Sequence, residues 1–154
     1  MTVIAYRDGL MAADTRIIHP DSGITRGTKL FRKRIGRRDH ILGFAGSLSG
    51  AALYLDWYSS GKPMPDALRH LPVEDYFGVL ILIGKQLYEG DCMCRPVEIE
   101  SKFHAIGSGA QAALGAMHRG ASALEAANIA CKIDPSCGLP IVTMSLPLLK
   151  RSIK

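Results

Sequence analysis

The chain has 154 residues, of which 47% are hydrophobic and 21% charged, and its formal net charge is +5 at pH 7. This size and balance are typical of a soluble globular protein, so we expect residues 1–154 to form a single domain with a buried core. The longest apolar run is VLILI at 79–83, which excludes a membrane-spanning helix of about 20 residues. No secretory signal is visible either. We expect a cytoplasmic protein with no membrane partner.

The first half of the chain is rich in strand patterns. Four segments combine β-forming residues with bounding turns: TVIAYR (2–7), LMAAD (10–14), KLFRK (29–33) and HILGFA (40–45). Asp8-Gly9 predicts a tight hairpin turn between the first two. Residues 15–28 are polar and contain two glycines, which predicts a loop or an irregular extension.

Helices enter from residue 48 onward. Helical spacing of apolar residues, or an N-cap serine before such a segment, predicts three helices, at 48–61, 108–119 and 121–132. Further strands are expected at 78–84, 85–90, 102–107 and 140–146, and the proline-containing stretch 62–77 leaves room for one short helix. Strands grouped apart from helices favour an α+β layered fold over an alternating parallel sheet.

The excess positive charge is concentrated in RKRIGRR, residues 32–38, which holds five cations. No aromatic residues interleave with them, as a base-stacking platform would require. We interpret the segment as a solvated hairpin tip. A nucleic-acid-binding module remains as a hypothesis that rests on this segment alone.

Four cysteines fit a reducing compartment as free thiols. The spacing of Cys92 and Cys94 differs from that of zinc-binding pairs, and no second pair supports it. The five histidines show no metal-site spacing. We therefore expect no metal and no cofactor.

Thr2 is the candidate nucleophile. Removal of Met1 would give Thr2 a free α-amino group with a pKa of about 7.7–8.0, which is able to act as the base for its own hydroxyl. The first hairpin returns Asp14 toward residue 2, and Lys29 begins the third strand. A lysine beside the nucleophile assists proton transfer, and a carboxylate keeps that lysine charged and oriented. A strand residue without a chemical role is the alternative for Thr2.

These motifs, taken in order, resemble the proteasome β-subunit family of N-terminal nucleophile hydrolases, and most closely its short phage and bacterial proteasome-like members. The similarity extends over nearly the whole chain. The segments that carry it are the N-terminal Thr2, AADTR (12–16), KLF (29–31), GFAGS (43–47), AIGSGA (105–110) and DPSCG (134–138). The fold implied by the resemblance is a four-layer αββα sandwich.

The resemblance also implies roles for single residues. The catalytic set is Thr2, Asp14, Lys29, the N–H of Gly43 as oxyanion donor, Ser108 and Asp134, and Arg16 takes a structural position. The substrate-binding residues implied are Ile17, Gly27, Ile41 and Ala45. Cys137 is a departure, because active relatives commonly place a serine there.

The leading hypothesis is a threonine endopeptidase that cleaves peptides or unfolded proteins through Thr2 after loss of Met1. By resemblance it works in a homo-oligomeric ring of six or seven subunits, which a separate ATPase unfoldase feeds. The alternative is an inactive or weakly active assembly protein of the same fold, motivated by Cys137 and by the shortened region 62–77.

Overall fold

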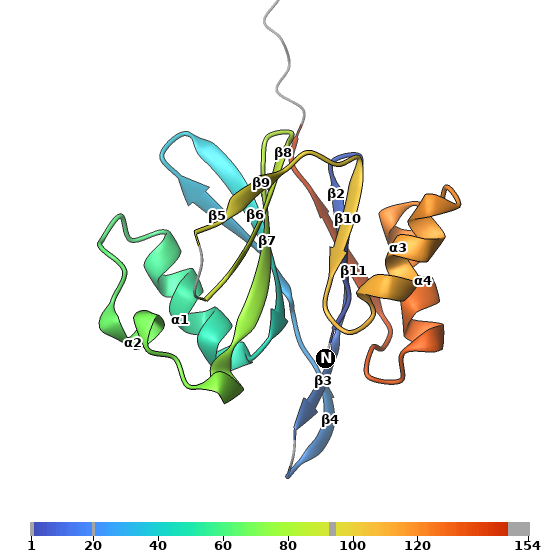
Figure 1. The fold of residues 1–154 in the computed structure, drawn as a ribbon, viewed down its shortest axis with the longest axis horizontal. Helices are drawn as coiled ribbons and strands as arrows, with labels where there is room; N and C mark the ends of the chain where they lie inside the picture. The colour runs from blue at the N-terminus through green and yellow to red at the C-terminus, as the bar shows by residue number, and fades with distance from the viewer. Residues whose placement is uncertain (1, 20, 93–94, 148–154) are drawn as a thin grey trace, which may run out of the picture.

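The computed structural model describes residues 2–19, 21–92 and 95–147, so Met1 and Cys94 lie outside the described part. Two β-sheets face each other, and helices cover the outer side of each sheet (Figure 1). The chain therefore has the expected α+β architecture, a four-layer αββα sandwich. Among the described residues, none of the helices has the length and apolar character needed to cross a bilayer.

One sheet has four strands in the order β10-β1-β2-β11. Its members are β1 (Ile4–Arg7), β2 (Leu10–Asp14), β10 (Phe103–Ile106) and β11 (Ile141–Ser145). All three pairings are antiparallel. The turn between β1 and β2 has positive φ at both Asp8 and Gly9, the geometry that aspartate followed by glycine favours in two-residue hairpins.

The second sheet has five strands in the order β5-β6-β7-β8-β9. They are β5 (Leu30–Ile35), β6 (Arg38–Gly46), β7 (Phe77–Ile83), β8 (Gln86–Asp91) and β9 (Val97–Ile99). The basic segment forms the end of the β5–β6 hairpin, as the sequence predicts, with Ile35 paired to Arg38 across the turn. The short edge strand β9 was not predicted from the sequence.

Helices α3 (Ala110–His118) and α4 (Ala123–Ile133) cover the four-stranded sheet, while α1 (Leu48–Tyr58) lies on the five-stranded one (Figure 1). Between α1 and β7 the chain forms α2 (Asp66–Arg69) and a 3-10 turn (Val73–Asp75). Ser47 caps α1 by accepting a hydrogen bond from the N–H of Gly50. The expected cap of α3 is wrong: α3 begins one residue after Gly109, and the Ser108 side chain does not cap it.

Three apolar clusters hold the layers together. The cluster between the sheets is aliphatic and includes Ile4, Leu30 and Leu80. The one under α3 and α4 consists mostly of alanine. The one under α1 contains the rings of Phe44 and Tyr54. Burial of aliphatic and aromatic surface at about 25 cal/mol per Å² drives the layers together, so no disulfide is required.

The prediction of a loop at 15–28 is wrong in part. Residues Arg16–His19 and Gly23–Arg26 pair as the antiparallel strands β3 and β4, a two-stranded hairpin. It extends beyond the sandwich at the end that carries the N-terminus (Figure 1). Its polar, largely exposed composition hides the strand pattern, because neither face alternates cleanly between core and solvent.

Candidate active site

The end of β2 carries a buried carboxylate with four hydrogen-bond donors around it. Lys29 Nζ lies 2.8 Å from Asp14 Oδ1, and both side chains are almost fully buried. The N–H of Val3 donates to the same oxygen at 3.0 Å. The other oxygen accepts from the N–H groups of Arg16 at 3.1 Å and Gly138 at 3.0 Å. This set compensates the burial of the charge, which an isolated carboxylate would not tolerate.

Local register explains why Asp14 lies beside the start of the chain. Ile4 pairs with Ala13 in the β1–β2 hairpin, so Asp14 lies opposite Val3. The N–H of Asp14 also donates to the carbonyl of Val3 at 3.3 Å. The two-residue turn fixes this register, since a slip of one residue would turn the apolar side chains of both strands to the wrong face.

A second polar group approaches Thr2 from the helical layer. The Thr2 nitrogen donates to Ser108 Oγ at 3.1 Å, and Ser108 in turn hydrogen-bonds the carboxylate of Asp134. That bond, together with bonds from Ser136, lowers the pKa of Asp134 to about 2. The Cys137 thiol donates to Asp134 at 3.4 Å. Burial raises the pKa of Cys137 to about 12, so near neutral pH it is a protonated donor and not a nucleophile.

Glycines permit the close approach of residues 107–109 to Thr2. Gly107 has φ of +97°, and a Cβ there would collide with the Thr2 carbonyl. The same carbonyl accepts from the N–H of Gly109 at 3.2 Å. A Cβ on Gly109 would come within 3.0 Å of both Val3 and Cys137. The AIGSGA segment therefore needs its glycines to bring Ser108 to the Thr2 nitrogen.

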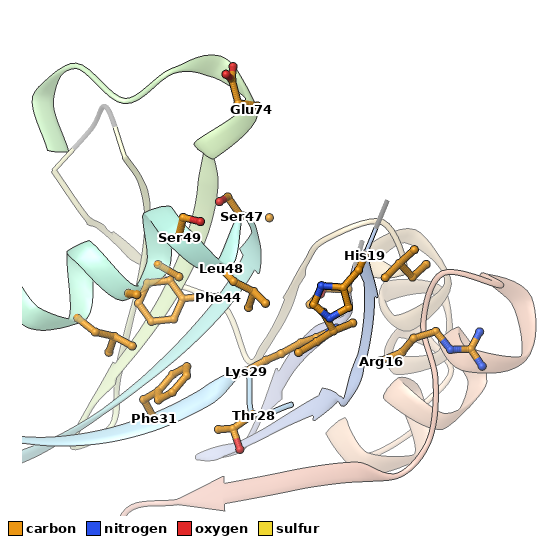
Figure 2. A pocket seen from close by; sticks show the side chains of 17 residues that line it. Arg16, His19, Thr28, Lys29, Phe31, Phe44, Ser47, Leu48, Ser49 and Glu74 are labelled. Carbon is orange, nitrogen blue, oxygen red and sulfur yellow. The ribbon is translucent and has the colours of Figure 1, made fainter. Parts of the chain in front are cut away.

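A cavity of about 480 Å³ opens beside Thr2 and Lys29. Its apolar lining comes from β3, the five-stranded sheet and α1, and comprises Ile17, Ile18, Phe31, Phe44, Leu48, Ala51, Ala52 and Leu55. Figure 2 shows Phe31, Phe44 and Leu48 together on one wall. The Arg16 guanidinium points away from this wall and donates to the carbonyl of Pro135 (Figure 2). The site therefore joins a buried polar network to a hollow suited to an apolar side chain.

The structure does not bring Gly43 to the cavity. It lies within β6, between Leu30 of β5 and Leu80 of β7. A Cβ at this position would come within 2.7 Å of Ile4 and 3.0 Å of Met11. Gly43 is a packing glycine that lets the two sheets approach, and its expected position at an open turn is wrong.

The second glycine of GFAGS occupies the strand-to-helix junction instead. Gly46 lines the cavity and has φ of +119°. The N–H of Phe44 donates to the backbone carbonyl of Lys29 on the β5 side, whereas the N–H of Ser47 donates to the backbone carbonyl of Tyr76 on the β7 side. N–H groups of a strand alternate between its two neighbours, so the N–H of Gly46 points to the β5 side, where β5 has not yet begun. This backbone donor faces the Thr2 cavity, and the sequence analysis missed it.

Strand alternation also decides the substrate-binding residues. Ile17 lines the cavity, and Gly27 adjoins it, because a Cβ there would collide with the Ile17 side chain. Ile41 is fully buried between the sheets, so a substrate-contacting role for it is wrong. Ala45 faces the same interior and borders a neighbouring hollow instead. Phe44, on the opposite face of β6, is the residue that lines the cavity; the expectation chose the wrong face of the strand.

No group of three or more His, Cys, Asp or Glu side chains within residues 2–19, 21–92 and 95–147 is arranged to hold a metal ion. The cysteine pair considered from the sequence includes Cys94, which lies outside these ranges. The five-cation segment lies at the far end of β5 and takes no part in the Thr2 site.

No family model and no curated protein sequence matches the chain. Solved structures do. BPH from Thiobacillus denitrificans in complex with epoxomicin is 22% identical with a TM-score of 0.70, over 96% of this chain and 98% of that one. Anbu, an ancestral β-subunit from Yersinia bercovieri, is 15% identical with a TM-score of 0.75, over 96% of this chain and 81% of that one.

A third similar structure is HslV from Trypanosoma brucei, at 16% identity and a TM-score of 0.60, over 94% of this chain and 99% of that one. The chain therefore has the proteasome-like fold of N-terminal nucleophile hydrolases, and the resemblance inferred from its motifs is confirmed at the level of the fold. At these identities the likeness concerns the fold, and the chemistry has to be argued from the site.

Proposed function

We propose that the chain is a threonine endopeptidase whose nucleophile is Thr2. The observation that carries this proposal is the convergence of two polar networks on one residue. Asp14 and Lys29 approach Thr2 from the strand side, and Ser108 and Asp134 approach its nitrogen from the helical side. A protein that used this fold only as a scaffold would gain nothing from burying the Asp14–Lys29 ion pair, because such pairs contribute little net stability.

In the proposed reaction Met1 is removed, and the Thr2 nitrogen becomes an amine. Thr2 Oγ attacks the carbonyl carbon of a peptide bond, and its proton passes to the amine and from there to the leaving amine. Ser108, polarised by Asp134, orients the amine from the position it already occupies 3.1 Å away. Lys29, held by Asp14, supplies a positive charge that favours ionisation of the hydroxyl. Water then hydrolyses the acyl-enzyme and restores Thr2.

The oxyanion of the tetrahedral intermediate accepts a hydrogen bond from the N–H of Gly46. This group replaces Gly43 in the mechanism, because its strand edge is open toward the cavity. A preorganised backbone donor of this kind contributes about 10²–10³ in rate. Ser47, which follows it, is fixed by a 2.8 Å hydrogen bond to Asp75, so the junction is held rigid at the point where the charge develops.

The apolar cavity indicates the substrate. Its volume of about 480 Å³ and its Phe31, Phe44 and Leu48 lining suit a large apolar side chain on the acyl side of the cleaved bond. Peptides with leucine or phenylalanine at that position should be cleaved faster than those with aspartate or lysine, because placing a charge against the wall of Phe31, Phe44 and Leu48 costs desolvation free energy.

Intact-mass measurement combined with covalent labelling tests the proposal. The native protein should lack the mass of Met1, and a peptide boronate or chloromethyl ketone should modify the N-terminal peptide in proportion to lost activity. Epoxomicin, the ligand in the BPH structure, is a second probe for the same residue. Hydrolysis by a preparation that retains Met1, or labelling confined to Cys137, would rule out Thr2 as the nucleophile.

A catalytically inactive assembly protein is the alternative, motivated by Cys137 at a position that favours serine in active relatives. The hydrogen bond from Cys137 to Asp134 supports activity, because the thiol still donates to the carboxylate that holds Ser108. Loss of Met1 without labelling of Thr2 by any electrophile, and without peptide turnover, would favour the alternative.

We further propose a closed homo-oligomer that hides Thr2 from folded proteins, with a separate ATPase delivering unfolded substrates. One similar structure, Anbu from Pseudomonas aeruginosa, is described as a helical assembly, which supports association but leaves its geometry open. A ring needs a heterologous interface whose rotation closes on itself. Light scattering at micromolar concentration tests this, and a monomer of 16.7 kDa would contradict it.

A further inference from the structure

A cleft beside the basic segment, residues 32–38, takes no part in the proposed peptidase reaction. Two hairpin turns lie side by side at the end of the molecule farthest from the N-terminus, β5–β6 and β7–β8 (Figure 1). Between them is a cleft of about 410 Å³. Arg34, which lines the cleft, lies five residues after Lys29 along β5, and at about 3.3 Å per residue this places the cleft about 17 Å from Lys29.

Positive charge dominates the rim of the cleft. Arg34, Arg37 and Arg38 come from the first hairpin and Lys85 from the second, and all four residues are exposed. The only carboxylate among the described lining residues is Asp39, which is paired with Arg34 at 3.0 Å. Like charges held this close repel one another, so an anionic occupant is favoured electrostatically.

The floor of the cleft is apolar. Ile83 at the end of β7 and Leu146 and Pro147 after β11 complete its lining, and the first two are only partly buried. A groove with cations around an aliphatic floor matches a ligand that carries carboxylates next to an apolar side chain. It matches nucleic acid poorly, because no aromatic residue lines the described cleft for base stacking.

We propose that this cleft binds an acidic peptide segment of a partner protein, with an aliphatic side chain on the Ile83–Leu146 floor and carboxylates on Arg37, Arg38 and Lys85. Arginine suits this role, since its planar guanidinium forms paired hydrogen bonds with a carboxylate. The segment is recognised by charge and one apolar contact. Its binding does not depend on the identity of the nucleophile at the other end of β5.

Fluorescence anisotropy of a labelled peptide of alternating glutamate and leucine tests the proposal. The peptide should bind, and the matched peptide with glutamine in place of glutamate should bind at least about tenfold more weakly. Replacing its leucines with serine should also weaken binding. Raising the salt concentration from 50 to 500 mM should weaken the acidic peptide alone, because screening removes the charge contribution.

Charge reversal locates the site. Arg37→Glu combined with Lys85→Glu should reduce affinity by about tenfold or more, while Lys62→Glu with Arg69→Glu, an equal charge change on the exposed α2 region, should have little effect. Unchanged melting temperatures verify folding of both variants. Equal loss in the two variants, equal binding of the acidic and amide peptides, or tighter binding of a single-stranded oligonucleotide than of the acidic peptide would each overturn the proposal.

Discussion

The two helical layers of the sandwich are built from different side chains. Under α3 and α4 the core consists largely of alanines, with Met117 as its largest side chain. Under α1 it is a cluster of rings in edge contact, including Phe44 with Phe77 at a centroid distance of 5.6 Å. Alanine lets the backbones of the helices and the sheet approach closely, whereas Phe44, Ala51 and Leu55 of the ring-containing cluster also line the cavity beside Thr2.

The two layers contribute different parts of the site. The alanine side supplies Ser108 and Asp134, which hydrogen-bond in a fixed chain to Thr2. The ring side supplies the walls of the cavity. The positions of Ser108 and Asp134 therefore depend on the tightly packed layer, and the fit of the proposed substrate depends on the layer with large side chains. The predictions below separate these two contributions.

The largest effect is expected at Thr2, where the two layers meet. Thr2→Ala should reduce peptide turnover by at least about 10⁴-fold, because it removes the proposed nucleophile. Thr2→Ser keeps a hydroxyl and an amine and should retain part of the activity. Steady-state kinetics on a fluorogenic leucine peptide measure both, and a matching circular dichroism spectrum controls for folding. A Thr2→Ala enzyme at the wild-type rate would contradict the mechanism.

Lys29→Met should be the next most damaging change for activity. It removes the positive charge near the nucleophile and should lower kcat by about 10²–10⁴-fold. It also leaves Asp14 buried with backbone donors alone, so we expect a loss of about 3–5 kcal/mol in unfolding free energy. Denaturant titration and kinetics at a temperature where the variant is folded measure the two losses. The double variant Asp14→Asn/Lys29→Met should regain stability without regaining activity.

The two cores should respond differently to a change in side-chain size. Phe44→Ala should cost about 3–5 kcal/mol by leaving a cavity among the rings, and should shift cleavage toward bulkier residues. Ala127→Leu, which overpacks the alanine layer, should cost about 1–3 kcal/mol and lower kcat with little change in preference. Thermal unfolding and a peptide panel distinguish them. Equal changes in substrate preference from both variants would contradict the assignment of the cavity walls to the ring-containing layer alone.

Asp134 should affect stability only above a defined pH. Its pKa is lowered to about 2, chiefly by the Ser108 hydrogen bond, from an ordinary value of 3.8. A lowered pKa stabilises the fold fully above pH 3.8, and this stabilisation is lost as the pH falls toward 2. Asp134→Asn should therefore be less stable than the wild type at pH 5 and approach it near pH 2. Urea titrations across this range measure the difference.

The smallest effect is expected at Cys137. Cys137→Ser preserves a donor to Asp134, so turnover should stay within about threefold and stability within about 1.5 kcal/mol. Because burial raises the pKa of the thiol from 9.0 to about 12, the unfolded chain ionises first and the wild type loses stability above pH 9. The serine variant should lose less stability over the same pH range, and the loss that remains comes from groups such as Cys131, whose pKa burial also raises. Iodoacetamide at pH 8 should modify Cys137 only after unfolding, as peptide mass spectrometry can determine.

Most helices and strands, and the pairing of strands that are adjacent in the chain, could be predicted from the sequence. Strand patterns around Asp8-Gly9 predicted the first hairpin, and its register fixes Asp14 opposite Val3. The basic hairpin tip and the helices at α1, α3 and α4 were likewise predicted within a few residues of their ends. These features depend on neighbours in the chain, through turn geometry and side-chain periodicity, so a local pattern is enough to identify them.

Long-range packing determines which strand faces and which backbone groups meet at the site. Residues 108 and 2 are distant in the chain, and only packing of α3 against β1 brings Ser108 to the Thr2 nitrogen. Gly46 lines the cavity where Gly43 was expected, and Phe44 lines it where Ile41 was expected. The point at which β5 ends determines which edge of β6 is open, and the covering helix determines which face is open. The alternation of side chains along a strand shows that the strand has two faces, but long-range packing determines which face is open to the cavity.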